Sequence, residues 1–433
     1  MTRLFDERLG EEVHRGALDD GLPFYVIPRP AFRQKYAVIA TRYGSCDAEF
    51  HAPGRDGPWR PPHGVAHFLE HELFEDEAGT VFDAFSKIGA SPNAYTSYDQ
   101  TAYHFGCVES FEPALDLLLG FVGKASFTDA SADRERRVIA QEIKMYEDSP
   151  GWQTMHALRE ALFVRHPVRI DICGTVATID EITAEQLDLC YRTFYRPDNM
   201  VLVVAGDLDP ADVLDRARAR WAEARPDAPA GGGEPLRRIA PDEPPEVVHP
   251  ERRLTLDVAA PRVLMGFKDR APGDEGEALL RRELEMSLLL DQIFGPASRF
   301  HDEHYRAGLI DATFSTGYAA DRDYGYAVIG GETERPDDLV DAVRRAIAQA
   351  RERGVDPDDI ARVRNKAVGR WVRLWNDVDR AADAQVTAHF LGIDLFRFIE
   401  VLESIDAESL DRRLREHLAE SLGVVVHVEP SGR

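Results

Sequence analysis

Two short stretches decide how this chain folds: ITAEQLD at 182–188 and IDAESLD at 405–411. They lie 223 residues apart, and the same offset, without a gap, places VLVV at 201–204 over VVVH at 424–427. Each half of the chain is therefore expected to end in a helix followed by a buried strand. Two copies of one α/β unit explain this better than the alternative, a chance similarity of two amphipathic helices.

A segment rich in proline and glycine separates the two copies. Between Arg225 and Pro250 the sequence has seven prolines and the run Gly231-Gly232-Gly233. Such a stretch can neither continue a helix nor enter a central strand, so we expect an extended linker. The predicted organisation is a first domain at 1–224, a linker at 225–253 and a second, homologous domain at 254–433.

Within the first copy, strand pairs alternate with helices. Paired strands are expected over 22–30 and 36–44, and a hairpin over 93–98 and 101–108. The hydrophobic periodicity predicts helices over 61–74, 82–88, 111–122 and 129–147. This order predicts an α+β fold of two homologous α/β sandwich units, each an antiparallel-rich sheet covered by helices.

The composition excludes several classes of protein. Of 433 residues, 44% are hydrophobic, and no apolar run approaches the roughly 18 residues of a membrane span. The net charge of −25 is expected to repel nucleic acid and anionic lipid. The first residues resemble no export signal, so a cytoplasmic location is expected. The four cysteines lack CxxC spacing and are expected to be free thiols without a function.

The motif HFLEH at 67–71 carries the strongest chemical signal. His67 and His71 are four residues apart, and therefore lie on one helical face, close enough for both to bind a zinc ion. Glu70 shares that face and can act as a general base beside a metal. The alternative is two surface histidines with a chance glutamate, and the motif alone does not decide between them.

Two glutamates of the helix expected over 129–147 are candidates for completing a metal site. Glu135 and Glu142 are seven residues apart, two helical turns, and so form one stripe. A catalytic zinc usually has three protein ligands, so one glutamate can be the third ligand and the other can orient a ligand. Without HFLEH, solvated acids on an amphipathic helix would be the better interpretation.

Five segments together resemble one family, the inverted-zincin (HxxEH) metallopeptidases of the insulinase or pitrilysin superfamily. This family includes the mitochondrial processing peptidase and short bacterial members. The resemblance covers nearly the whole chain, with the segments in the family's order and approximate spacing. They are GVAHFLEHELF at 64–74, GASPNAYTSYDQTAYHF at 89–105, ERRVIAQEI at 135–143, GTVATIDEIT at 174–183 and YRPDNMVLVVAGD at 195–207.

The resemblance implies a zinc-dependent endopeptidase that hydrolyses peptides or unfolded segments in a chamber formed by facing domains or subunits. It implies that His67, His71 and Glu142 bind one Zn²⁺ per chain, that Glu70 is the general base and that Glu135 supports a ligand. It also implies that substrate adds as a strand along Asn93, Ala94 and Tyr95. The competing hypothesis is a non-catalytic scaffold or assembly subunit of the same fold.

The second half departs from the family in two ways. It has no HxxEH, so it is not expected to bind zinc in the same manner. Where the family commonly has a substrate-binding arginine and, seven residues later, a tyrosine, this chain has His304 and Asp311. Arg306 is near in sequence, but two residues along a helix turn it about 200° away. We therefore expect a heterodimer with a homologous zinc-less subunit rather than a homodimer or a self-sufficient monomer.

Overall fold

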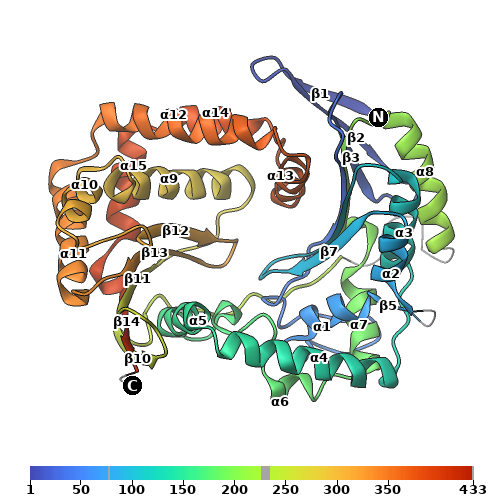
Figure 1. Ribbon diagram of the computed structural model, residues 1–433, viewed down its shortest axis with the longest axis horizontal. Coiled ribbons are helices and arrows are strands. Elements are labelled where there is room, and N and C mark those ends of the chain that lie inside the picture. Colours follow the sequence, from blue (N-terminus) through green and yellow to red (C-terminus); the bar gives the residue numbers. More distant parts are fainter. Residues whose placement is uncertain (77–78, 226–234, 432–433) are drawn as a thin grey trace. The chain divides into compact units, whose positions relative to one another are not determined.

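The computed structural model describes residues 1–76, 79–225 and 235–431, in two compact units (Figure 1). One unit comprises 1–143, 171–240 and 371–395, and the other comprises 144–170, 241–370 and 396–433. The expected glycine run of the linker, Gly231-Gly232-Gly233, lies outside the described residues. No helix in the described part of the chain is long and apolar enough to cross a membrane.

The first unit is built on a seven-stranded sheet of order β1-β2-β3-β9-β4-β8-β7. The expected hairpin is confirmed, because β7 pairs antiparallel with β8. The expected direct pairing of the strands over 22–30 and 36–44 is wrong, because β9 lies between β3 and β4. Every residue of β9 is buried, so this apolar strand is stabilised at the centre of the sheet. The strands are β1 (Thr2–Asp6), β2 (Glu11–Ala17), β3 (Pro23–Pro28), β4 (Lys35–Thr41), β7 (Ser91–Thr96), β8 (Thr101–Cys107) and β9 (Met200–Gly206).

The four helices expected in the first copy are confirmed within a few residues. They are α1 (Val65–Glu72), α2 (Val81–Lys87), α3 (Phe111–Gly123) and α4 (Asp129–Glu147). Several other helices begin at a serine, threonine or aspartate whose side chain caps the helix. In α7, for example, Thr183 and Gln186 form a capping box. The remaining elements of this half are β5 (Glu75–Asp76), β6 (Gly79–Thr80), α5 (Pro150–Leu162), α6 (Val176–Ile179), α7 (Ala184–Phe194) and α8 (Pro210–Ala224).

The second unit repeats the central topology of the first in a five-stranded sheet, β10-β14-β11-β13-β12. Strand β14 is parallel to β10 and antiparallel to β11, as β9 is to β3 and β4. The repeat inferred from ITAEQLD and IDAESLD is therefore confirmed as a repeat of fold. The strands are β10 (Glu251–Leu256), β11 (Arg262–Lys268), β12 (Ser315–Ala320), β13 (Gly325–Glu332) and β14 (Gly423–Pro430).

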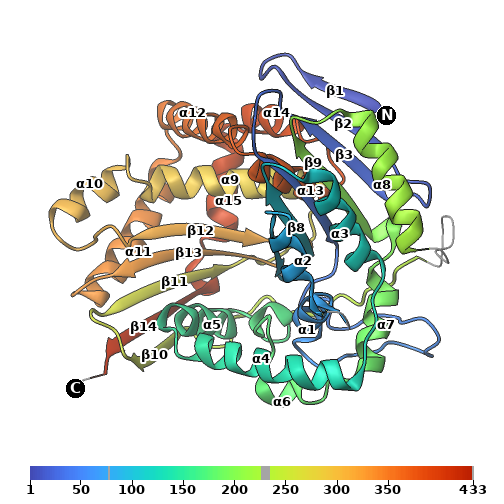
Figure 2. The same cartoon turned by 45° about the vertical axis from the view of Figure 1, so that its right-hand side comes forward.

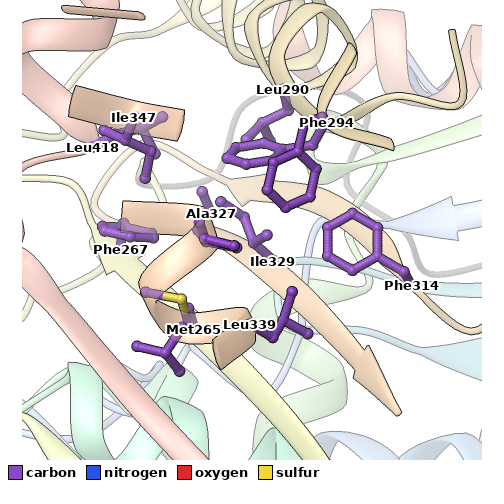
Figure 3. Close-up of a cluster of buried hydrophobic side chains, with 14 of the residues drawn as sticks. Met265, Phe267, Leu290, Phe294, Phe314, Ala327, Ile329, Leu339, Ile347 and Leu418 are labelled. Atoms are coloured by element: carbon purple, nitrogen blue, oxygen red, sulfur yellow. The ribbon is translucent and has the colours of Figure 1, made fainter. Parts of the chain in front are cut away.

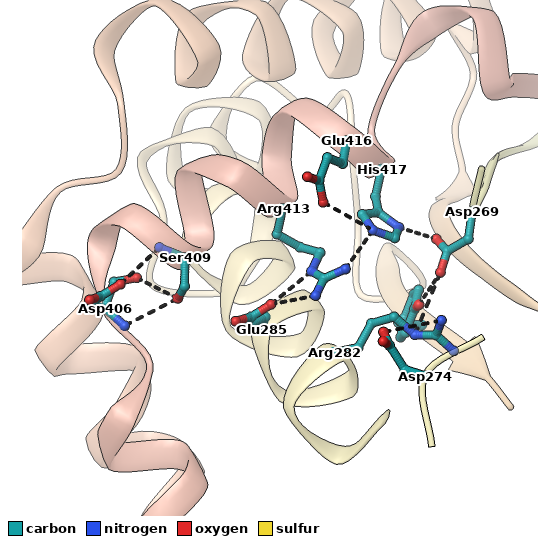
Figure 4. A network of polar contacts seen from close by, with 10 residues as sticks. Asp269, Asp274, Arg282, Glu285, Asp406, Ser409, Arg413, Glu416 and His417 are labelled. Atoms are coloured by element: carbon teal, nitrogen blue, oxygen red, sulfur yellow. Dashed lines mark hydrogen bonds and ion pairs between the residues drawn. The ribbon is translucent and has the colours of Figure 1, made fainter. Parts of the chain in front are cut away.

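Helices and a buried polar network complete the second unit. Apolar side chains of β11, β13, α9 and α11 form its core (Figure 3). Beside them, Arg413 donates hydrogen bonds to Glu285 and to His417, which contacts Asp269 (Figure 4). These charged groups are paired, as burial requires. The helices of this half are α9 (Gly276–Phe294), α10 (Arg299–Arg306), α11 (Pro336–Arg353), α12 (Pro357–Leu374), α13 (Val378–Leu391), α14 (Arg397–Ser404) and α15 (Ala407–His417).

Neither unit is continuous in sequence, because each receives a helix from the other half of the chain. Helix α13 packs on β4 and β9 of the first sheet, on the face opposite α3 and α8. Helix α5 packs on β10, β11 and β14 of the second sheet (Figure 2). A sheet with two apolar faces requires cover on both, and each exchanged helix supplies one layer. The sequence expectation of two continuous domains did not anticipate this exchange.

Candidate metal centre

Helix α1 carries the HFLEH motif and is held against the sheet by its apolar side. Phe68 and Leu69 are fully buried, and α1 packs against β7 and α7. The helix begins after Gly64, whose φ of 93° is in the left-handed region. A Cβ at Gly64 would lie 2.4 Å from the carbonyl oxygen of Cys173, so only glycine permits this close approach. The start of α1 is thereby fixed against the segment at 173–174.

The two histidines converge on Glu142 of α4. One carboxylate oxygen, Oε2, lies 3.7 Å from His67 Nε2 and 3.4 Å from His71 Nε2. The imidazole centroids are 4.7 Å apart. Two ligand atoms, each about 2.05 Å from a tetrahedral zinc, are about 3.3 Å apart, close to both carboxylate distances. Two imidazole nitrogens and a carboxylate are also a common donor set for catalytic zinc. These three residues fit a zinc ion.

Glu135 lies on the other side of the His71 ring. Its Oε2 is 3.2 Å from His71 Nδ1, and the residue is 9% exposed. A carboxylate at this nitrogen fixes the ring orientation and leaves Nε2 available as the ligand atom. The two glutamates, which the helical spacing alone does not distinguish, therefore have different surroundings, with Glu142 between the histidines and Glu135 behind one of them.

Burial and neighbouring charges set the pKa values of the two histidines in opposite directions. Burial, reinforced by the nearby His71, lowers the pKa of His67 to about 4. Burial also acts to lower the pKa of His71, but hydrogen bonds with Glu135 and Glu142 outweigh it and raise that pKa to about 9. A histidine must be neutral to bind a metal, so a metal ion bound at Nε2 would displace a proton from His71.

Glu70 is buried beside the histidines and is held by a threonine. It is 8% exposed, and its Oε2 accepts a 2.6 Å hydrogen bond from Thr96 Oγ1 at the end of β7. Burial raises the pKa of Glu70, and the hydrogen bond from Thr96 opposes this rise. The sequence reasoning did not identify Thr96, because no spacing within TSYDQT indicates a partner on α1.

The structure also brings a cysteine close to the predicted metal ligands. Cys173 Sγ lies 3.8 Å from His67 Nε2. One ligand atom each from His67, Glu142 and Cys173 all lie within 4.8 Å of one another. Burial raises the pKa of the Cys173 thiol. The expectation that the cysteines are free thiols is confirmed for all four. No CxxC or CxH spacing could have indicated Cys173, which is 106 residues after His67.

The predicted substrate-binding residues lie on β7, the strand at one edge of the first sheet. Among the described residues, Asn93, Ala94 and Tyr95 pair only with β8, on one side of the strand. Asn93 Oδ1 accepts a hydrogen bond of 2.9 Å from the backbone amide of Ala94. The Tyr95 hydroxyl accepts a hydrogen bond from Gln100 across the hairpin. The strand is thus an edge to which an extended peptide can add.

The residues that depart from the family pattern have local contacts within the second unit. His304 stacks on Phe300 and contacts its carbonyl oxygen at 2.7 Å. Asp311 accepts hydrogen bonds from the backbone and hydroxyl of Thr313. Arg306 is paired with Asp302 at 2.9 Å, with 78% of its side chain exposed. Each of these side chains therefore contacts a residue within its own loop or helix.

Comparison with known proteins relates this chain to peptidase family M16. Residues 61–176 match the family model of insulinase (peptidase family M16), and 181–367 match that of the peptidase M16 inactive domain. The chain is 37% identical over 424 residues to the uncharacterized zinc protease YmfH of Bacillus subtilis, with 98% of each chain covered.

Solved structures agree with these matches. The crystal structure of an M16-like peptidase from Alicyclobacillus acidocaldarius superposes with a TM-score of 0.92 at 37% identity, covering 97% of this chain and 99% of that one. Pitrilysin, at 16% identity, shares the fold, with a TM-score of 0.75 over 99% of this chain and 46% of its own. Sequence and fold together show that the chain belongs to the M16, or insulinase, family of peptidases.

Proposed function

We propose that this chain is an active zinc-dependent endopeptidase rather than a non-catalytic subunit of the same fold. The main observation in support is that His67 and His71 both point to Glu142, with Glu70 buried on the same helical face. Gathering four ionisable side chains at a largely buried site is costly unless a metal or a reaction uses them. A scaffold has no physical reason to keep this set.

In the proposed chemistry, each of these side chains has a separate role. Zinc, when bound, supplies a Lewis acid that polarises the peptide carbonyl and makes a water molecule more acidic. His67, His71 and Glu142 are the proposed ligands of one ion per chain, and Glu135 orients His71. Glu70 removes the proton from the attacking water and then delivers it to the leaving amine.

The proposed substrates are peptides or unfolded segments that bind as an extended strand beside Asn93, Ala94 and Tyr95. The supporting observation is that β7 is an edge strand whose last residue, Thr96, contacts the proposed base. A peptide added there pairs by backbone hydrogen bonds, so binding depends more on an extended conformation than on the sequence of the peptide. A chamber formed by facing domains or subunits is proposed to exclude folded proteins.

The experiment that tests this function compares wild type with Glu70→Gln for zinc content and for cleavage of a quenched peptide library. We expect one zinc in both proteins and a loss of about two to four orders of magnitude in turnover for the variant. Wild type that holds zinc but cleaves nothing, alone or with a partner, would favour the scaffold. Equal turnover of the two proteins would disprove the role of Glu70.

We also propose that activity requires a homologous zinc-less subunit. The chain has His304 and Asp311 where the family commonly has its substrate-binding arginine and tyrosine, and Arg306 is already paired with Asp302. A carboxylate such as Asp311 would repel a developing oxyanion. Addition of the zinc-less homologue is expected to raise turnover per zinc. No rise, together with a loss of activity in Arg306→Ala, would instead indicate a self-sufficient chain.

A further inference from the structure

We propose that Cys173 is a fourth protein ligand of the metal, so that its thiolate closes the coordination position left open by His67, His71 and Glu142. This inference rests on the proposed function, because it concerns the same metal. It adds a residue from a segment that the HxxEH motif does not include. All four residues belong to the first unit.

The first argument is the distance between donor atoms. Cys173 Sγ lies 3.8 Å from His67 Nε2, and both lie within 4.8 Å of a Glu142 carboxylate oxygen. Nitrogen and sulfur ligands at about 2.05 and 2.3 Å from a tetrahedral zinc are about 3.6 Å apart. The separation of Cys173 Sγ and His67 Nε2 is therefore close to that of two zinc ligands, and a Glu142 carboxylate oxygen lies near both atoms.

The second argument is the surroundings of the buried His67 ring. The residue is 7% exposed, and its Nδ1 has no hydrogen-bond partner within the described residues. A buried ring of this kind usually gains stability by pairing both nitrogens. Here the ring instead directs Nε2 toward Glu142 and Cys173. A metal at that position would bind Nε2, the ring nitrogen that faces both residues.

The third argument is that the backbone holds Cys173 in place. Gly64 lies so close to Cys173 that a Cβ there would meet its carbonyl oxygen at 2.4 Å, and a Cβ at Gly174 would meet the His63 carbonyl oxygen at the same distance. The amide of Cys173 donates to Asp171 Oδ1 at 2.9 Å. Contacts on both sides of the cysteine thus hold its backbone beside the start of α1.

The chemistry of such a site is balanced in charge. On binding, the thiol of Cys173 loses its proton to solvent and a sulfur–metal bond forms. Two anionic ligands, Glu142 and the thiolate, then neutralise a divalent ion. Four protein ligands describe a closed site, so before hydrolysis water or a peptide carbonyl would have to displace the sulfur, and the released thiolate would take a proton back from solvent. The cysteine would keep the resting metal protected.

Cobalt(II) provides a direct test, because a bound thiolate produces a charge-transfer absorption in the near ultraviolet. Metal-free wild type, Cys173→Ala and Cys107→Ala are each titrated with one equivalent of cobalt(II), and zinc affinity is measured by competition with a chelator. Cys107 is the matched control, because it is a buried cysteine with the same 5% exposure. Thermal unfolding of each variant checks that it is folded.

We expect the charge-transfer band in wild type and Cys107→Ala, its loss in Cys173→Ala, and zinc binding at least about tenfold weaker in that variant. Cobalt bound by wild type without the band, or a band that persists in Cys173→Ala, would overturn the inference and leave the proposed function intact. If wild type binds neither cobalt nor zinc, the inference and the proposed function fail together.

Discussion

Thr96 Oγ1 donates a 2.6 Å hydrogen bond to Glu70 Oε2, which connects the edge strand β7 to the proposed general base on α1. The two residues are 26 positions apart in sequence, and both are partly or fully buried. A hydrogen bond to a carboxylate is stronger than a neutral one and fixes its direction. A peptide that binds along β7 would therefore lie next to a base that the same strand positions.

Removing this hydrogen bond should impair catalysis without removing the metal. Thr96→Val keeps the shape of the side chain but leaves Glu70 free to rotate, so we expect kcat to fall about 10- to 100-fold with little change in KM. Thr96→Ser retains the hydroxyl and should recover most of the activity. Zinc content and unfolding temperature are measured for both variants. Equal kcat in Thr96→Val and wild type would show that the bond has no catalytic role.

The two glutamates of α4 should differ in their effect on zinc. Glu142 lies between both histidines, whereas Glu135 contacts only His71 Nδ1. Glu135→Gln is expected to weaken zinc binding roughly 10- to 100-fold, as is typical for a residue that orients a ligand, and Glu142→Gln should weaken it more. Chelator competition measures both. If the Glu135 variant holds no zinc and the Glu142 variant holds a full equivalent, the two assignments must be exchanged.

The close contact at the start of α1 should make Gly64 intolerant of substitution. An alanine there must adopt a φ of 93° and would also collide with the Cys173 carbonyl. Gly89→Ala is the matched control, because Gly89 has a φ of 73° but no atom lies within 4 Å of the position that its Cβ would take. We expect Gly89→Ala to cost about 1 kcal/mol of unfolding free energy and Gly64→Ala clearly more. Similar costs in denaturant unfolding would contradict the argument.

His389 of α13 should make stability depend on pH. Burial, with Arg15 and Arg42 nearby, lowers its pKa to about 4, while Tyr25 contacts its Nδ1 at 3.2 Å. The unfolded chain, with a histidine pKa near 6.5, therefore binds more protons than the folded chain between pH 4 and 6.5. Stability contributed by neutral His389 is thus present above pH 6.5 and lost as the pH falls toward 4.

His389→Gln removes this titration. Relative to the variant, wild type should lose on the order of 2 kcal/mol of unfolding free energy between pH 6.5 and pH 4. Denaturant unfolding of both proteins at several pH values checks the difference, which cancels the contribution of other groups. A difference that stays constant with pH would show that His389 has an ordinary pKa in the folded protein.

Local patterns were sufficient to predict much of the molecule from its sequence. The helix at 129–147, the hairpin around Asp99 and Gln100, and the repeat of a helix followed by an apolar strand follow from periodicity and turn residues, which act over a few positions. The spacing of His67, Glu70 and His71 likewise determined that these side chains share one helical face, because 3.6 residues complete a turn.

Only the tertiary structure decided which distant segments meet. It inserted β9 between β3 and β4, exchanged α5 and α13 between the two units, and placed Thr96 and Cys173 beside the HFLEH helix. It also gave Glu142 and Glu135 different contacts with the histidines, which their spacing on one helical stripe does not determine. These relationships depend on burying both faces of each sheet and on close backbone packing at Gly64, and such long-range packing leaves no spacing signal in the sequence.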